Sequence, residues 1–399
     1  MGRVIVIGAG PAGMMAAIFA ARAGARVLLL EKNQEAGKKL LLTGGGRCNL
    51  TNTKAGEDLP AQYPGGGRFL HSCLARYGPR FICQFFQDIG VELVTEEEGR
   101  VFPKSLRAAS VRDALLRELK SLGAEIRYCQ PVRKLRLAGG KVAGVASDSF
   151  YPGQHVILAT GGASFPATGS TGDGYSLAQR AGHTLVPPKA ALTPLIIEES
   201  WPRSLSGLSV FAQGQIQAGR RKLKSQGQLL FTHFGLSGPL ALNLSRYLEK
   251  GAAVELNFLP GLRGEELLQV GSTAAQSLDR FLPRRLARQL LELAEIPPQT
   301  KNLNRAEKER LEKVLFAAKL TVAGTKPLEE AMVTAGGVAL DEVNPKTMAS
   351  KKKAGLYFAG ELLDIDGITG GYNLTIAFAT GCAAGSAAGS AAAGEVLYG

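Results

Sequence analysis

A glycine-rich turn between an apolar strand and an apolar helix constrains the fold of this chain more than any other feature. Residues Arg3–Ile7 are predicted to form a short strand, GAGPAG follows at residues 8–13, and a helix then leads to a second strand, RVLLLEK, near Glu31. A GxGxxG string alone is common, but here an acidic residue also ends the next strand about 20 residues further on. This context predicts a dinucleotide site in a Rossmann-like βαβ unit.

The residue types in this turn match what a dinucleotide requires. Gly8 allows the tight turn, Gly10 lets a pyrophosphate approach the backbone, and Gly13 lets the helix pack closely on the strand. The start of the helix favours the negative charge of the phosphates. Glu31 is placed to accept hydrogen bonds from a ribose hydroxyl group.

Two later strands indicate that the dinucleotide is FAD. HVILATGGAS at residues 155–164 and LYFAGELLDIDG at residues 356–367 are apolar strands that end in small-residue turns. Such elements are typical of a two-dinucleotide-fold flavoprotein, in which the C-terminal segment returns to the first domain. A simple NAD dehydrogenase has no need of this return. GGYNLTIAFATG at residues 370–381 then starts a helix whose first amides are expected to face the flavin.

Three consecutive glycines in TGGGRCNLTN, residues 43–52, predict the close approach of a ligand to the backbone. Such a run maximises backbone freedom and contributes little to a core. Residues 44–46 admit a planar ring, and Arg47 is suited to oppose negative charge on a reduced flavin or a phosphate. Cys48 is either a proton donor near the flavin or a small residue that fills a gap.

The chain resembles the BaiN/RdsA-type (YhiN-like) family of NAD(P)/FAD-dependent oxidoreductases over nearly its whole length. The resemblance rests on TGGGRCNLTN, on GRVFP at residues 99–103, on FTHFGLSGP at residues 231–239 and on the GGYN segment. It implies that the triple-glycine turn passes against the flavin, with Arg47, Asn49 and Asn52 fixing the loop. The chain departs from the family pattern at Thr375, where a Gln usually follows GGYN two residues on.

This resemblance and the changes of periodicity predict an α/β fold with a discontinuous, two-dinucleotide-binding (Rossmann-like) FAD domain and an insert. Residues 1–189 and 332–399 are assigned to the FAD-binding domain. Short alternating strands between glycine turns predict a β-barrel insert over residues 190–263 and 320–331. Amphipathic patterns of helical period predict a helical insert over residues 264–319.

The candidate site residues come from all these motifs. The catalytic candidates are Cys48 and His233, and a purely structural histidine is the alternative for the second. No metal ligands are expected. The cofactor-binding candidates are Gly8, Gly10, Pro11, Ala12, Gly13, Glu31, Lys32, Lys39, Gly44, Gly45, Gly46, Arg47, Asn49, Asn52, Val132, Ala159, Thr160, Gly161, Gly360, Glu361, Asp364, Gly370, Gly371, Tyr372 and Asn373.

The chain is basic, with 47 Lys and Arg residues against 34 Asp and Glu residues and a net charge of +13. This excess is either a solubility feature or the mark of a polyanionic partner. Two of three basic clusters, GRRKLK at residues 219–224 and PRRLARQ at residues 283–289, fall in the insert, and the third is KKK at residues 351–353. The RNA-binding candidates are Arg220, Arg221, Lys222, Arg284, Arg285 and Arg288.

These features favour an FAD enzyme that passes a hydride from flavin N5 to a conjugated carbon–carbon double bond. NAD(P)H is the expected electron donor and binds transiently, because no second GxGxxG marks a separate site. The resemblance implies two substrate classes. One is uridine in ribosomal RNA, reduced to dihydrouridine, and the other is a small molecule, either an enone such as a steroid ring or an oxidisable amine. A flavin-dependent sensor or RNA-binding scaffold is the non-enzyme alternative, and the completeness of the redox motifs disfavours it.

The cysteine pattern and the apolar segments favour a cytoplasmic protein with no membrane partner. The five cysteines include no CxxC pair and their number is odd, which fits a reducing compartment. The apolar start runs directly into the glycine turn and is not expected to be a signal peptide. The Ala- and Gly-rich run over residues 374–393 is expected to pack as a helix on the sheet rather than to anchor in a membrane.

Overall fold

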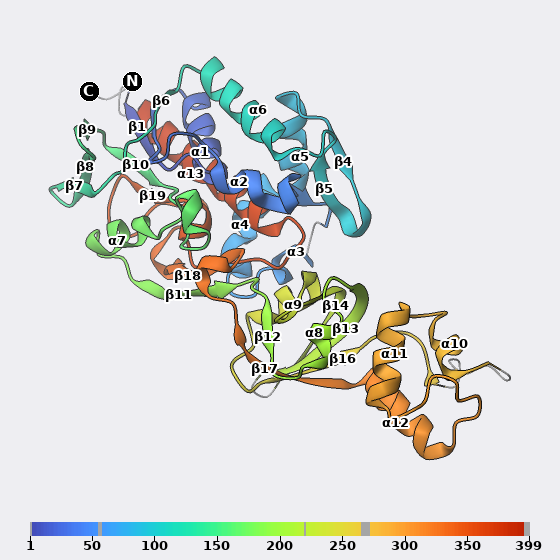
Figure 1. Cartoon of the computed structure of the whole chain (residues 1–399). Helices are drawn as coiled ribbons and strands as arrows, with labels where there is room; N and C mark the ends of the chain where they lie inside the picture. The colour runs from blue at the N-terminus through green and yellow to red at the C-terminus, as the bar shows by residue number, and fades with distance from the viewer. Residues whose placement is uncertain (1, 55–57, 219–220, 265–271, 395–399) are drawn as a thin grey trace. The chain divides into compact units, whose positions relative to one another are not determined.

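The computed structural model describes residues 2–54, 58–218, 221–264 and 272–394. The chain divides into two compact units (Figure 1). Unit 1 comprises Met1–Lys189 and Val333–Gly399, and unit 2 comprises Ala190–Met332. The chain therefore leaves the first unit once and returns to it once, as a discontinuous domain does.

A five-stranded parallel sheet forms the centre of unit 1, with strand order β19-β10-β1-β2-β6. Its strands are β1 (Arg3–Ile7), β2 (Arg26–Leu30), β6 (Glu125–Arg127), β10 (His155–Leu158) and β19 (Leu356–Phe358). The three middle strands are almost continuous apolar runs, because both faces of a parallel sheet are covered by other elements. Strand β19 lies beside β10, which confirms the predicted return of the C-terminal segment.

Two helices with small residues pack tightly on this sheet. They are α1 (Pro11–Arg22) and α13 (Tyr372–Gly394). Gly381, Gly385 and Gly389 of α13 each lie against a backbone carbonyl of α1, where a Cβ atom would collide. By length and composition α13 is apolar enough to cross a membrane, but 72% of its most apolar window is buried in the unit. The predicted packing of this segment on the sheet is confirmed.

Further helices and two small sheets complete unit 1. The helices are α2 (Lys38–Leu42), η1 (Thr43–Gly46), α3 (Asp58–Ala61), α4 (Gly67–Tyr77), α5 (Pro79–Asp88), η2 (Glu97–Gly99), α6 (Ala108–Ser121), η3 (Pro166–Thr168), α7 (Asp173–Arg180), η6 (Leu340–Glu342) and η7 (Gly360–Leu362). One antiparallel sheet has the order β3-β5-β4, with strands Thr51–Asn52, Arg100–Pro103 and Leu93–Thr95. The other has the order β7-β8-β9, with strands Lys134–Ala138, Lys141–Ala146 and Phe150–Pro152. Strands β11 (Leu185–Ala191) and β18 (Val333–Val338) pair where the chain leaves and re-enters the unit.

Unit 2 is a closed β-barrel with a set of helices, so the predicted barrel is confirmed. The barrel order is β12-β15-β14-β13-β16-β17, with strands Leu195–Ile197, Gly235–Ser237, Arg221–Thr232, Ser209–Ala218, Ala253–Asn257 and Ala318–Thr325. The helices are α8 (Trp201–Ser204), α9 (Gly238–Ser245), α10 (Ala274–Leu278), α11 (Arg284–Leu293), α12 (Arg305–Phe316) and η5 (Leu328–Glu330). A second hydrophobic core holds this unit together, and Trp201, Phe231 and Phe258 form an aromatic cluster in it.

Candidate dinucleotide and redox site

The turn between β1 and α1 contains three glycines with different physical roles. Gly8 has a φ of +99°, and a Cβ atom there would come within 2.6 Å of the Ala159 carbonyl oxygen. At Gly13 a Cβ atom would collide with the carbonyl oxygen of Gly8, so helix and turn are in direct contact as expected. At Gly10, by contrast, a Cβ atom would meet no atom within 4 Å. The backbone at Gly10 is therefore open to a ligand.

The carboxylate of Glu31 is fastened to this turn. Its Oε2 accepts a hydrogen bond of 2.7 Å from the Ala9 amide, and its Oε1 accepts bonds of 2.8 Å from the amide and side chain of Asn33. The residue is 6% exposed. A carboxylate has about four acceptor positions. Glu31 therefore fixes the turn and retains acceptor capacity for a hydroxyl group.

Two lysines predicted to bind the cofactor form ion pairs beside the turn. Lys32 donates hydrogen bonds of 2.5 Å to Thr171 and to Asp173 at the start of α7. Lys39 donates hydrogen bonds of 2.7 Å to Ser164 Oγ and 2.8 Å to Glu361 Oε2. Both ammonium groups are thus held in defined positions by acidic partners.

Lys39 and Glu361 belong to segments that contact the dinucleotide turn directly. The amide of Gly37, just before α2, donates a 3.0 Å hydrogen bond to the Ala9 carbonyl oxygen. A Cβ atom at Gly360 would lie 2.7 Å from Cβ of Ala12. The two members of the pair therefore belong to segments that contact the turn at Ala9 and at Ala12, and Pro11 and Ala12 are the first residues of α1.

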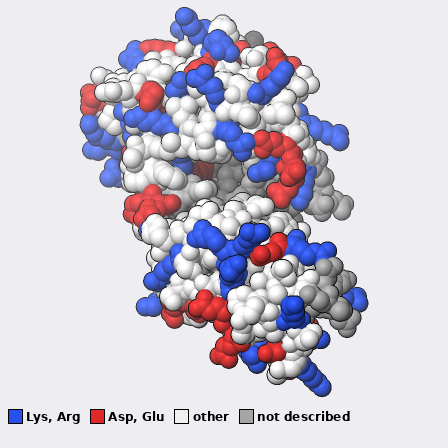
Figure 2. Space-filling model, turned by 45° about the vertical axis from the view of Figure 1, so that its right-hand side comes forward, with Lys and Arg blue, Asp and Glu red and all other residues white. Residues whose placement is uncertain are grey.

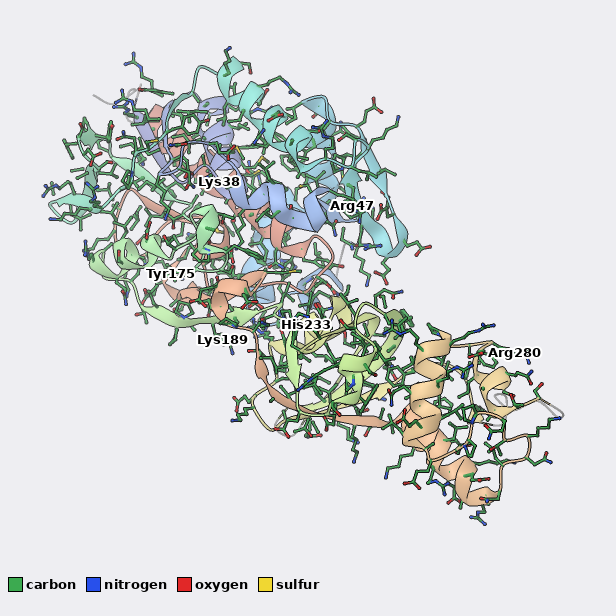
Figure 3. All side chains as sticks on the ribbon, viewed as in Figure 1. Lys38, Arg47, Tyr175, Lys189, His233 and Arg280 are labelled. Carbon is green, nitrogen blue, oxygen red and sulfur yellow. The ribbon has the colours of Figure 1, made fainter. Side chains whose placement is uncertain are left out.

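The triple-glycine turn exposes its backbone. Gly44, Gly45 and Gly46 have φ values of 58°, 66° and 84°, in the left-handed region that favours glycine. All three are exposed, and a Cβ atom at Gly45 would meet no atom within 4 Å. The turn connects α2, which starts at Lys38, to Arg47 (Figure 3). It presents exposed backbone that a ligand can approach at Gly45.

Arg47 is directed at protein partners. Its Nη1 donates a 2.8 Å hydrogen bond to Glu96 Oε1, and its guanidinium carbon lies 4.3 Å from the centre of the Phe102 ring. These contacts fix the glycine turn to the β3–β5–β4 sheet. They support the loop-fixing role that the resemblance implies, and they leave the Arg47 charge already balanced by a carboxylate.

Cys48 is part of the hydrophobic core. It is 0% exposed and adopts a φ of 63°. Burial raises the pKa of its thiol to about 12, and a hydrogen bond with Thr43 opposes this shift. A thiol enclosed by protein atoms presents no surface to a substrate. The geometry therefore favours the gap-filling interpretation of Cys48 over the proton donor.

Two asparagines hold the segment that precedes α13, and one of them, Asn52, reaches it from the end of the TGGGRCNLTN motif. Asn52 donates hydrogen bonds of 3.1 Å to the Glu98 carbonyl and 3.2 Å to the Gly370 carbonyl. Asn373 accepts from the Gly367 amide and donates to the Gly367 carbonyl, both at 2.8 Å. These bonds hold the segment that includes Gly370 and Gly371 in a fixed conformation.

Asn49 and Tyr372 differ in what they offer a ligand. Asn49 Oδ1 is buried and has no hydrogen-bond partner among the described residues. The Tyr372 ring is 2% exposed and packs edge-on against Tyr63, with 6.0 Å between ring centres. Tyr372 was predicted to hold FAD, and because its side chain is buried, this stays a prediction for its backbone at the start of α13.

The remaining cofactor-binding candidates lie along the carboxyl edge of the parallel sheet. Ala159, Thr160 and Gly161 directly follow β10, and the Ala159 amide donates a 2.9 Å hydrogen bond to Ile7. Val132 is 9% exposed and follows the segment in which the Gln130 amide bonds to the Glu31 carbonyl at 2.8 Å.

Three further residues lie close to the Lys39–Glu361 ion pair, and none of them was among the candidates predicted from the sequence. Ser164 and Thr334 join the Lys39–Glu361 pair, with the Thr334 amide donating a 2.8 Å hydrogen bond to Glu361 Oε1. Burial raises the pKa of Tyr175, and the nearby carboxylates of Glu361 and Asp364 raise it further. Ser164 could have been predicted, because it ends the HVILATGGAS motif. Thr334 on β18 and Tyr175 on α7 belong to no motif in the sequence.

The candidate His233 lies on the other unit. It is exposed in the turn between β14 and β15, and its ring packs edge-on against Phe234 with 4.9 Å between ring centres. All the cofactor-binding candidates belong to unit 1, whereas His233 belongs to unit 2.

The candidate RNA-binding residues are exposed where the structure describes them. The Arg284 side chain is 82% exposed, with its Nε atom 3.5 Å from Asp279. Arg285 donates a 2.7 Å hydrogen bond to the Ser204 carbonyl, and Arg288 and Lys222 are also exposed. Arg220 and the side chain of Arg221 lie outside the described residues. Lys and Arg side chains occur over the visible faces of both units, interspersed with acidic ones (Figure 2).

Comparison with known proteins identifies the family. The model of the HI0933-like protein Rossmann domain matches residues 2–387. The chain belongs to this HI0933-like family. A 3-dehydro-bile acid delta(4,6)-reductase of Clostridium scindens is 35% identical to it, over 96% of this chain and 98% of that protein. A ribosomal RNA dihydrouridine synthase of Escherichia coli is 32% identical, over 95% of this chain and 96% of that protein. This HI0933-like chain is accordingly an oxidoreductase.

Solved structures share its fold at lower identity. The 3-ketosteroid delta1-dehydrogenase from Sterolibacterium denitrificans has a TM-score of 0.54 at 13% identity, covering 98% of this chain and 100% of that chain. The 3-ketosteroid-delta4-(5alpha)-dehydrogenase from Rhodococcus jostii has a TM-score of 0.51 at 17% identity, covering 98% and 96%. At these identities the likeness establishes the shared fold.

Proposed function

We propose that this protein binds FAD and reduces a carbon–carbon double bond conjugated to a carbonyl, with uridine in ribosomal RNA as its substrate. The observation that carries the redox part is the exposed triple-glycine backbone in the same unit as the dinucleotide turn. A bound flavin, once reduced by NAD(P)H, supplies the hydride. Uracil fits because its C5=C6 bond is conjugated to a carbonyl group, as in any enone.

The residues of unit 1 fit FAD at both ends of the molecule. Gly10 offers open backbone at the start of α1, where helix amides favour phosphate. Glu31 offers acceptor positions for a ribose hydroxyl group. Gly45 offers open backbone to a planar ring. Open backbone at Gly10, free acceptor positions on Glu31 and open backbone at Gly45 lie in one unit, and together they support the proposal of a dinucleotide with a ring system.

The reduction is completed by a proton, which comes from a side chain of this chain or from water. Addition of a hydride at one carbon of the double bond leaves the neighbouring carbon to be protonated. Cys48 is enclosed by the core and is therefore not assigned this role. His233 has an exposed ring, and we assign it the role of proton donor.

The RNA substrate is supported by a local cluster rather than by net charge. Residues 190–332 hold 19 Lys and Arg against 14 Asp and Glu, and the rest of the chain holds 28 against 20, so the excess is shared in proportion to length. Arg284, Arg285 and Arg288 are instead concentrated on one exposed segment of α11. The Escherichia coli and Haemophilus influenzae relatives at 32% identity are both named ribosomal RNA dihydrouridine synthases.

A small-molecule enone is the second candidate substrate. The Clostridium scindens relative, at 35% identity, is named as a bile acid reductase. The same hydride chemistry serves a steroid enone, and such a substrate has no need of the α11 arginines. The two candidates therefore differ in whether those arginines matter for turnover.

The test combines cofactor identification with analysis of the RNA product. FAD, rather than FMN, is expected in the supernatant after denaturation. Unmodified ribosomal RNA treated with the enzyme and NAD(P)H is then digested to nucleosides for mass spectrometry. A uridine that has gained two hydrogen atoms supports the proposal. Absence of flavin refutes the redox part, and FAD with no modified uridine but with turnover of a steroid enone refutes the RNA part.

A further inference from the structure

We infer that Phe281 and three arginines close to it in the sequence of unit 2 form a stacking surface for an unpaired nucleobase of single-stranded RNA. This inference rests on the proposed function, because it names how the RNA substrate would be held. The surface consists of Phe281, Arg280, Arg284 and Arg288, at the end of the α10–α11 connection and along the first turns of α11.

The backbone of this connection is well defined while the Phe281 ring remains exposed. The Phe281 and Leu282 amides donate hydrogen bonds of 3.0 Å and 2.9 Å to the Leu278 carbonyl. Leu278 and Leu282 are 0% and 6% exposed, so they anchor the connection in the core of the unit. Phe281 is 36% exposed between these anchors. Its ring is thus presented on a fixed backbone without being needed to fill the core.

One cation lies beside this ring, and two more follow on the next helix. The guanidinium carbon of Arg280 lies 5.7 Å from the centre of the Phe281 ring. The Arg284 side chain is 82% exposed, and Arg288 follows one helical turn later on α11. Among the described residues, Asp279 is the acidic partner recorded for Arg284, at 3.5 Å.

This concentration of charge works against the stability of the helix. Arg284 and Arg285 lie in the first turn of α11, which contains no acidic residue. The start of a helix carries partial positive charge, and cations there are unfavourable. Arg284 and Arg288 also form an i, i+4 pair of like charge, which is destabilising. A bound polyanion relieves both repulsions.

A flat ring beside one arginine, followed by two exposed arginines on α11, matches single-stranded RNA in particular. Proteins that bind single strands combine basic grooves, which follow the phosphates, with aromatic rings on which bases stack. An acidic peptide would form ion pairs with the arginines, but its carboxylates would not stack on the Phe281 ring. A duplex keeps its bases stacked inside and offers phosphates alone. An enzyme that reduces a base must reach it unstacked, and this surface holds an unpaired neighbour of such a base.

The experiment compares two RNA ligands of equal charge on the full-length, flavin-loaded protein. One is a single-stranded oligouridylate, and the other is an abasic ribose-phosphate chain of the same length. Phe281→Ala is expected to lower affinity for the oligouridylate by about tenfold or more, and to leave affinity for the abasic chain unchanged. Phe281→Tyr, which keeps a ring, is expected to retain wild-type affinity for both.

Phe211→Ala provides the matched control, because Phe211 is a 44% exposed phenylalanine on the barrel strand β13. It is expected to bind both ligands as the wild type does. The inference is overturned if Phe281→Ala binds oligouridylate like the wild type, or if it loses affinity equally for both ligands. If the wild type binds neither ligand at low salt, the RNA part of the proposed function fails as well.

Discussion

Lys39 and Glu361 form an ion pair of 2.8 Å although 322 residues separate them in the sequence. Lys39 lies on α2 beside the dinucleotide turn, and Glu361 lies just after β19, the strand that returns from the C-terminal part. Ser164 and Thr334 complete the network from two further segments. The pair therefore joins four separate parts of unit 1 around the turn, and it does so with side chains of the kind that bind phosphate and hydroxyl groups.

The first prediction concerns Lys39. We expect its ammonium group to neutralise phosphate charge at the turn, so Lys39→Met is expected to weaken FAD binding by about tenfold or more. Binding of riboflavin, which lacks phosphates, is expected to change little. Fluorescence titration of the apoprotein measures both. Lys38→Met, the adjacent lysine on α2, serves as control, and equal FAD affinity in the two variants contradicts the role assigned to Lys39.

The second prediction separates the glycines of the dinucleotide turn. Gly10 has a φ of −77° and open space around its missing Cβ, so Gly10→Val is expected to fold with a near wild-type melting temperature. Its FAD binding is expected to be lost, because the side chain blocks the pyrophosphate. Gly13→Ala is expected to lower the melting temperature of the apoprotein itself, because its Cβ collides with the Gly8 carbonyl. If Gly10→Val retains FAD, the turn does not bind the dinucleotide as proposed.

The third prediction concerns thiol reactivity. Burial raises the pKa of Cys48 to about 12, so its thiol is protonated at neutral pH and enclosed by the core. Iodoacetamide is expected to alkylate the exposed Cys129 in the folded protein and to spare Cys48. Peptide mass spectrometry reads both sites. If Cys48 is alkylated as fast as Cys129, its thiol is accessible and Cys48 is again a candidate proton donor.

The fourth prediction concerns acid stability through His183. Burial lowers the pKa of His183, Glu342 opposes this shift, and Lys352 adds to it. The unfolded chain therefore binds the proton more readily than the folded chain, and stability is lost as the pH falls below the ordinary histidine pKa of about 6.5. The melting temperature is expected to drop between pH 7.5 and pH 5.5, and to drop less in His183→Gln. A parallel decrease in the two proteins rules out His183 as the cause.

Sequence reasoning predicted those parts of the fold that are encoded by local patterns. The strand–turn–helix around Gly8, the return of β19 and the change to barrel periodicity each leave a signal within a short segment. The helices of unit 2 likewise show their amphipathic period, and Asn304 begins α12 with a capping box. The carboxyl edge of the parallel sheet follows from this order of elements, and with it the general position of the site.

The sequence was less informative about which side chains face a ligand. Arg47 and Cys48 are neighbours in one motif, yet Arg47 contacts Glu96 and Cys48 enters the core. Tyr372 belongs to a glycine-rich motif but is buried against Tyr63. Such partners depend on tertiary contacts with β5, with Glu96 before η2 and with Tyr63 after α3, and these contacts leave no pattern in a single sequence. Phe281 was missed for the same reason, because its exposure depends on its neighbours filling the core.

We propose that this protein passes electrons from FAD to the double bond of an RNA uridine. Anaerobic spectroscopy of the flavin measures this electron transfer. The flavin is first bleached with NAD(P)H without oxygen, and unmodified ribosomal RNA is then added. We expect the yellow absorbance to return at the same rate as dihydrouridine appears. Reversing the charges of Arg284, Arg285 and Arg288 is expected to slow this return without slowing the bleaching. If the reduced flavin is not reoxidised by ribosomal RNA but is reoxidised by a small enone, uridine in ribosomal RNA is not the substrate.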